Sequence, residues 1–81
     1  MHYDEIKSRL NKVFCAVFKD DTIIISEETT AKDIEKWDSL THLILISATE
    51  TEFAIKFKLK ELIVMKNVGD FMKSIETKLA L

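Results

Sequence analysis

The chain has 81 residues, of which 47% are hydrophobic and 32% are charged, and its formal net charge is −2. A chain of this length forms one domain at most, and its small core leaves little room for a complete active site. The near balance of acids and bases gives no basic surface for nucleic acid, and no apolar run approaches the roughly 20 residues that span a bilayer. We therefore expect a single domain over residues 1–81 that acts through partner proteins.

The N-terminal segment is charged and lacks the apolar stretch of a secretory signal, so the expected compartment is the cytoplasm. Cys15 is the single cysteine, which excludes an intrachain disulfide and a cysteine-cluster metal site. Proline is absent and Gly69 is the single glycine. Because tight β-hairpins depend on glycine-containing turns, this composition favours helices joined by irregular loops.

Residues 3–18 are predicted to form the first helix, because their apolar side chains recur at helical spacing and form one stripe. The stripe consists of Ile6, Leu10, Val13, Phe14, Val17 and Phe18. Residues 19–38 then form a long connection. Its run of residues 22–25 has strand propensity, but no second strand is available to pair with it. We expect an extended loop whose isoleucines, together with Ile34 and Trp37, anchor it to the core.

Residues 39–53 are predicted to form the second helix. Asp38 is the expected cap, because its carboxylate can accept hydrogen bonds from free N–H groups of the first turn. The expected inner face consists of Leu40, Leu43, Ile46 or Ser47, and Phe53, with Ile44 and Leu45 broadening the apolar surface.

The remainder of the chain is also predicted to be helical. A short helix over residues 58–65 is expected to turn Leu59, Leu62 and Ile63 inward. A last helix over residues 68–79 is expected to begin at Asn67 as N-cap, with Asp70 as its capping-box partner. Its apolar stripe consists of Val68, Phe71, Met72, Ile75 and Leu79. The expected fold is all-α, with three main helices, one short helix and a long first loop.

The segment Trp37-Asp38-Ser39-Leu40 stands at the start of the second helix and is followed by Thr41-His42-Leu43. It resembles the Asp-Ser-Leu signature of acyl and peptidyl carrier proteins, the family of phosphopantetheine-attachment domains. Residues 29–34, 50–53, 57–62 and 68–71 are also similar to segments of that family, so the resemblance covers nearly the whole chain. The resemblance implies an acyl-carrier-like bundle.

The same resemblance implies that Ser39 is the attachment point of a 4′-phosphopantetheine arm, with Asp38 and Leu40 beside it in the cofactor site. A separate magnesium-dependent phosphopantetheinyl transferase would move the arm from coenzyme A, and its thiol would hold acyl or aminoacyl groups as thioesters. Such a carrier catalyses nothing; it raises the local concentration of a tethered substrate. The position also suits a phosphodiester, because free N–H groups and the positive end of the helix dipole lie beside it.

Carriers of the fatty-acid type tend to be strongly acidic along their second helix, whereas residues 37–81 of this chain hold six acids and six bases. Ile44 lies where that type often has an acid. We expect His42, Leu43 and Ile44 to form a docking surface for an apolar partner. The expected protein is a specialised monomeric carrier that serves loading and cargo-processing enzymes of a dedicated polyketide, peptide, glycan or fatty-acid pathway. Small polar residues at Ser47 and Thr49 favour a short or polar cargo.

Other interpretations remain open. Ser39 and Asp38 can serve only as helix caps, His42 can be a solvated surface histidine, and Cys15 can be a small core residue. At the level of function, the alternatives are an unmodified helical interaction module and a peptidyl or D-alanyl-type carrier loaded by an adenylating enzyme. An enzyme in its own right has no supporting constellation of residues.

Overall fold

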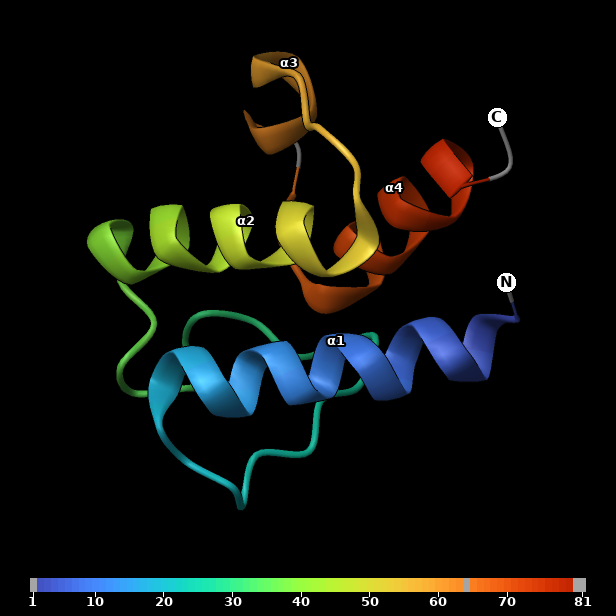
Figure 1. Ribbon diagram of the computed structural model, residues 1–81. Helices are drawn as coiled ribbons and strands as arrows, with labels where there is room; N and C mark the ends of the chain where they lie inside the picture. Colours follow the sequence, from blue (N-terminus) through green and yellow to red (C-terminus); the bar gives the residue numbers. More distant parts are fainter. Residues whose placement is uncertain (1, 64, 80–81) are drawn as a thin grey trace.

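The computed structural model describes residues 2–63 and 65–79. Within these residues it contains no strand and four helices, which are α1 (Tyr3–Phe18), α2 (Ser39–Phe53), α3 (Leu59–Ile63) and α4 (Val68–Leu79). Helices α1, α2 and α4 form the bundle, and α3 lies on its far side from α1 (Figure 1). The predicted bounds of the three main helices are confirmed. Helix α3 is shorter than predicted, and residue 64 of the predicted range lies outside the described residues.

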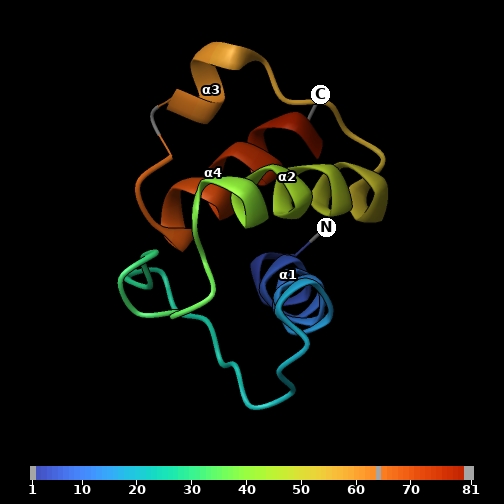
Figure 2. The same ribbon diagram turned by 90° about the vertical axis from the view of Figure 1, so that its left-hand side faces the viewer.

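Helix α1 packs against both α2 and α4, and Figure 2 shows it nearly end-on beneath them. Its buried side chains belong to the predicted stripe and are Ile6, Leu10, Val13, Phe14 and Phe18. The ring of Phe14 lies at the centre of an aromatic cluster, 5.3 Å from Trp37 and 6.2 Å from Phe71 between ring centroids. Burying a large apolar side chain stabilises a fold by about 1.5–3 kcal/mol. The packing of these rings therefore contributes to holding α1, α4 and the long connection together.

The connection over residues 19–38 is anchored as predicted at Ile25 and Trp37, which are buried, while Ile23 and Ile34 pack against the core in part. Ile24 contradicts the prediction, because 87% of its surface is exposed. In an extended backbone successive side chains point to opposite sides. When Ile23 and Ile25 face the core, Ile24 must therefore face solvent.

The side chain of Asn11 supplies the hydrogen bonds that a partner strand would have given. Its Nδ2 donates to the carbonyl of Ile23 at 3.0 Å, and its Oδ1 accepts from the backbone N–H of Ile25 at 2.7 Å. A buried, extended segment without a strand partner needs such compensation for its polar backbone groups. The side-chain amide of Asn11 therefore fixes the position of residues 23–25 against α1.

The start of α4 docks on the same connection. The backbone N–H of Gly69 donates to the carbonyl of Glu27 at 2.9 Å, and that of Val68 donates to the carbonyl of Thr29 at 2.9 Å. A Cβ on Gly69 would lie 3.0 Å from the Glu27 oxygen, so a larger residue would have to push the two segments slightly apart.

The predicted cap of α4 is also present, because Asn67 Oδ1 accepts from Asp70 N at 2.9 Å. The Asp70 carboxylate departs from the expected capping box, because it accepts from the backbone N–H of Lys66 at 2.8 Å rather than from that of Asn67.

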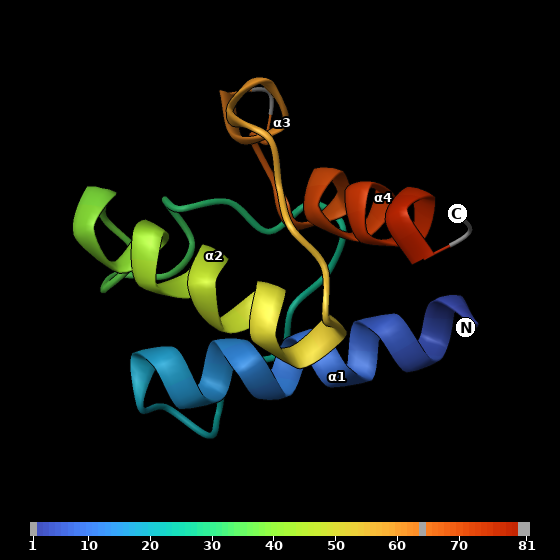
Figure 3. The ribbon, with the colours of Figure 1, turned by 45° about the horizontal axis from the view of Figure 1, so that its top comes forward.

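The predicted inner faces of α2 and α3 are partly wrong. Helix α2 buries Leu45, Ile46, Thr49 and Phe53, whereas Leu40 and Leu43 are 69% and 64% exposed. Apolar residues surround the first half of α2, so periodicity cannot select its buried side. Figure 3 shows α3 standing apart from the other helices. Of its three apolar residues, Leu62 packs against the core in part, while Leu59 and Ile63 are exposed.

Candidate functional site

Ser39 is exposed and is the first residue of α2. Asp38 precedes it with an extended backbone (φ −125°, ψ −171°) and caps the helix as predicted. Its Oδ1 accepts from Thr41 N at 2.9 Å, and its own N–H donates to Thr41 Oγ1 at 2.8 Å. The hydrogen bonds that the carboxylate accepts, first from the backbone N–H of Thr41 and then from its hydroxyl, lower the pKa of the Asp38 carboxyl. The result is a capped helix start at which Ser39 is exposed beside the positive end of the dipole.

Thr41 is a residue of the site that sequence reasoning missed. Its hydroxyl donates to the carbonyl of Lys36 at 2.8 Å, so it ties the first turn of α2 back to the connection that precedes it. The spacing Asp-x-x-Thr, which places a hydroxyl three residues after the cap, is the signal that could have identified it.

His42 is not the solvated surface histidine of the alternative interpretation. Its ring is half-buried, stacks on Trp37 at 6.0 Å between centroids, and meets Phe71 edge-on at 5.9 Å. Its Nδ1 accepts a hydrogen bond from Trp37 Nε1 at 3.0 Å. Burial lowers the pKa of His42, which favours the neutral ring. The sequence does not show this contact, because it depends on how the connection turns Trp37 back toward α2.

A hollow of about 420 Å³ lies beside Ser39. Its lining comes from three segments and consists of Ala31, Trp37, Asp38, Ser39, His42, Met65 and Lys66. The long connection, the start of α2 and the link between α3 and α4 therefore meet at the serine. Met65 offers an adaptable apolar wall, and Lys66 adds a cation to the lining of the same hollow.

Exposed apolar side chains follow Ser39 along α2. The apolar surface of α2 consists of Leu40, Leu43 and Ile44, with exposed fractions of 69%, 64% and 50%. Leu43 and Ile44 were predicted to dock partners, and the structure leaves both accessible. Leu40, predicted to lie inward, instead extends this surface to the residue next to Ser39.

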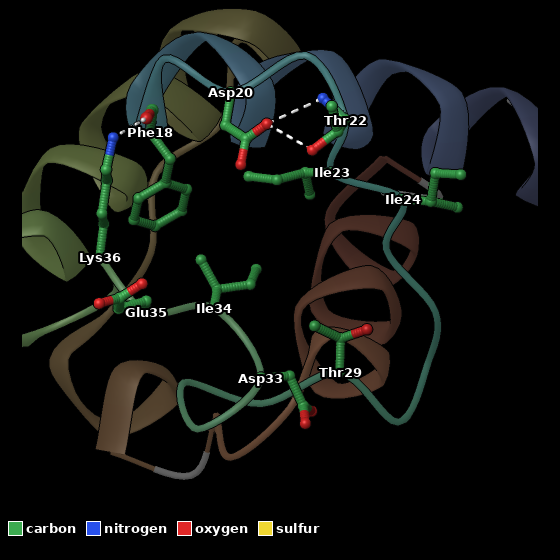
Figure 4. A pocket seen from close by; sticks show the side chains of 10 residues that line it. All are labelled: Phe18, Asp20, Thr22, Ile23, Ile24, Thr29, Asp33, Ile34, Glu35 and Lys36. Carbon is green, nitrogen blue, oxygen red and sulfur yellow. Dashed lines mark hydrogen bonds between the residues drawn. The ribbon is translucent and has the colours of Figure 1, made fainter.

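A second hollow, of about 330 Å³, lies between the end of α1 and the long connection (Figure 4). Phe18, Ile23 and Ile34 form its apolar walls. At its rim Asp20 accepts hydrogen bonds from Thr22 N at 2.9 Å and Thr22 Oγ1 at 2.6 Å. It shares no lining residue with the hollow beside Ser39, so it is not part of the candidate site.

Among the described residues, no group of three or more histidines, cysteines and acids is placed to hold a metal ion. Within that same part of the chain, no helix has the length and apolar character needed to cross a membrane.

Comparison with known proteins identifies the family. No protein-family model and no curated protein matches the chain. Among solved structures, the chain is similar to a holo acyl carrier protein from Geobacter metallireducens, whose structure was determined in solution by NMR. The two are 46% identical over 90% of this chain and 84% of the other, with a TM-score of 0.86. The all-helical fold agrees with this similarity, and the chain belongs to the acyl carrier protein family.

Proposed function

We propose that this protein carries acyl or aminoacyl groups as thioesters on a 4′-phosphopantetheine arm attached to Ser39. The observation that supports it most is that Ser39 is exposed at a capped helix start, beside the 420 Å³ hollow. A phosphodiester on Ser39 would meet the free N–H groups of the first turn of α2. The structural neighbour is described as a holo protein, which is consistent with this assignment.

In the proposed attachment, a bond forms between Ser39 Oγ and phosphorus while the pyrophosphate bond of coenzyme A breaks. The adenosine bisphosphate leaves, and the serine proton passes to the transferase. Asp38 and Thr41 act by holding the helix start rigid, so that Oγ is presented in one orientation. Once bound, the arm supplies a thiol for thioester formation, and this chain itself catalyses nothing.

The apolar surface of α2 is the proposed docking surface for the phosphopantetheinyl transferase and for the loading and processing enzymes. Leu40, Leu43 and Ile44 are exposed on it, and apolar side chains favour a partner with an apolar contact over one that relies on basic residues. We therefore propose a dedicated pathway. His42, the third residue expected to dock, is half-buried, so a contact with a partner uses only the exposed part of its ring.

We also propose that the cargo is short or polar. Thr49 supports this only through its small size, because it is fully buried in α2 and its hydroxyl already donates to the carbonyl of Leu45 at 2.7 Å. Ser47 does not, because it is exposed. Loading a series of acyl groups and comparing the midpoints of thermal unfolding tests the idea. Greater stabilisation by long chains than by short ones would count against it.

The proposal includes a single domain over residues 1–81 that works as a monomer in the cytoplasm. A D-alanyl or peptidyl carrier would use the same arm on Ser39 but would be loaded by an adenylating enzyme. Assays of the holo protein with acyl-loading enzymes and with amino-acid-activating enzymes distinguish an acyl carrier from an aminoacyl carrier. The remaining alternative is an interaction module of the same fold that is never modified.

Intact-mass measurement separates the carrier from the unmodified module. We incubate the chain with coenzyme A, Mg²⁺ and a broad-specificity phosphopantetheinyl transferase. We expect the mass to rise by one phosphopantetheine group in the wild type, not to rise in Ser39→Ala, and to rise normally in Ser47→Ala. Ser47 is a matched control because it is an exposed serine on the same helix. No adduct on the wild type, or an adduct that survives Ser39→Ala, contradicts the assignment.

A further inference from the structure

Trp37 and His42 lie on the two sides of Ser39 in the sequence and are joined across it in space. Trp37 Nε1 donates to His42 Nδ1 at 3.0 Å, and the two rings stack at an interplanar angle of 18°. Both rings line the hollow beside Ser39, and Trp37 is buried against the core. The hydrogen bond therefore closes the four-residue segment that contains Asp38 and Ser39 into a fixed turn.

The protonation state of His42 determines whether this bond can exist. The indole N–H of tryptophan is a donor only, so Nδ1 of His42 must be an unprotonated acceptor, and the ring proton of the neutral form lies on Nε2. A protonated imidazolium has donors at both nitrogens and no acceptor. Because histidine is the side chain that ordinarily titrates between about pH 5 and pH 8, acidification in that range removes the acceptor.

The groups around His42 come from several elements. Trp37 faces it from the long connection and Phe71 from α4. Lys66, from the link between α3 and α4, and Asp38, from the start of α2, line the same hollow. Burial is the cause that lowers the pKa of His42, and the Asp38 carboxylate accepts a hydrogen bond from the N–H of Thr41. Aromatic burial therefore dominates and keeps the ring neutral at neutral pH.

We propose that the Trp37–His42 hydrogen bond is a pH-sensitive positioning element for Ser39. While His42 is neutral, the bond ties the start of α2 to Trp37, which is packed in the aromatic core, and so fixes the Asp38–Ser39 turn that partner enzymes meet. When His42 is protonated, the bond is lost, the turn loosens, and Ser39 is modified more slowly. This inference rests on the proposed role of Ser39 as the attachment point.

The first test observes the bond itself and needs no modification of Ser39. Trp37 is the single tryptophan, so its indole N–H gives one NMR signal, which we follow in the unmodified full chain from about pH 8 to about pH 5. We expect this signal to shift with the same midpoint as the His42 ring, below the ordinary histidine pKa of 6.5. An indole signal that does not move while the His42 ring titrates overturns the proposal.

Three variants make this test specific. His42→Phe keeps a stacked ring but removes the acceptor, and His42→Asn keeps an oxygen acceptor that does not titrate; in both, the pH-dependent indole shift should vanish. His2 is the other histidine of the chain and is exposed in front of α1. His2→Asn should therefore leave the shift unchanged, and a shift that disappears in His2→Asn contradicts the assignment to His42.

The second test measures the initial rate of Ser39 modification, with each variant compared to the wild type at the same pH so that the transferase's own pH dependence cancels. At about pH 7.5 we expect His42→Phe to react about threefold to tenfold more slowly, which is the range that one neutral hydrogen bond supports, and His42→Asn to recover most of the rate. As the pH falls through the His42 midpoint, the wild type should slow relative to His42→Asn.

Equal pH profiles for the wild type and His42→Asn overturn the positioning role, even where the indole signal titrates. Absence of an adduct at every pH overturns the carrier assignment and the positioning role together. The NMR titration still decides whether the Trp37–His42 bond responds to pH, so the two failures are distinguishable.

Discussion

Helices α1 and α2 have similar lengths but use their apolar residues differently. In α1 the apolar residues form one stripe, and five of them are buried in the core. In α2 the apolar residues continue around the helix, so that Leu45 and Ile46 are buried while Leu40, Leu43 and Ile44 remain exposed. A single stripe is what folding requires. The additional apolar residues of α2 do not serve the core, and they form the surface proposed above for partner docking.

The two helices also begin differently. His2 precedes α1 without a side-chain capping hydrogen bond, whereas Asp38 and Thr41 bond reciprocally at the start of α2. The start of α2, where Ser39 lies, is therefore held by side-chain capping hydrogen bonds, whereas the start of α1 has no such bond from His2. Substitutions in α1 should change stability, and substitutions at the start and on the exposed side of α2 should change recognition.

The largest expected effect is a loss of stability caused by a substitution in α1. Phe14 is fully buried among Phe18, Trp37 and Phe71, so Phe14→Ala should lower the free energy of unfolding by about 3–5 kcal/mol. Urea unfolding followed by circular dichroism measures it, with Phe14→Leu as a milder variant. The control is Ile24→Ala, at an exposed loop position, where a change within about 0.5 kcal/mol is expected. Similar losses for both would contradict the assigned core.

Leu43→Gln should separate stability from recognition. Leu43 is 64% exposed and glutamine is a good helix former, so the free energy of unfolding should change by no more than about 0.5 kcal/mol. If Leu43 is buried by the transferase, kcat/KM for modification should fall by about tenfold. The control, Ile24→Gln, removes an exposed isoleucine outside α2 and should leave kcat/KM unchanged. An equal loss of kcat/KM in Leu43→Gln and Ile24→Gln would contradict a docking role that is specific to α2.

The smallest effect concerns the cap of α2. Because hydrogen bonds from Thr41 lower the pKa of Asp38 below its ordinary value of 3.8, the ionised carboxylate stabilises the fold above that pH. This contribution is lost as the pH falls through the lower pKa of the folded state. Stability curves of the wild type and Asp38→Asn should therefore differ at neutral pH and converge in acid. Curves that stay parallel would show that the charge of Asp38 has no part in the cap.

Much of this fold could be predicted from the sequence, because the bounds of α1, α2 and α4 and the cap at Asp38 follow from local patterns. The buried side of α2 could not, since its apolar residues lack a single stripe. Local patterns also miss contacts made by side chains distant in sequence, such as the amide of Asn11 on the loop backbone. The same limit applies to His42, whose environment depends on the positions of Trp37 and Phe71.

The central claim is that one hydroxyl in the first turn of α2 receives the arm. Fragmentation mass spectrometry of the modified chain tests it most directly, because α2 also contains the hydroxyls of Thr41, Ser47, Thr49 and Thr51. We predict that the phosphopantetheine mass lies on Ser39 alone. Thr41 should remain unmodified because its hydroxyl is held by Lys36 and Asp38. A phosphopantetheine mass found on any residue other than Ser39, or on none, would contradict this prediction.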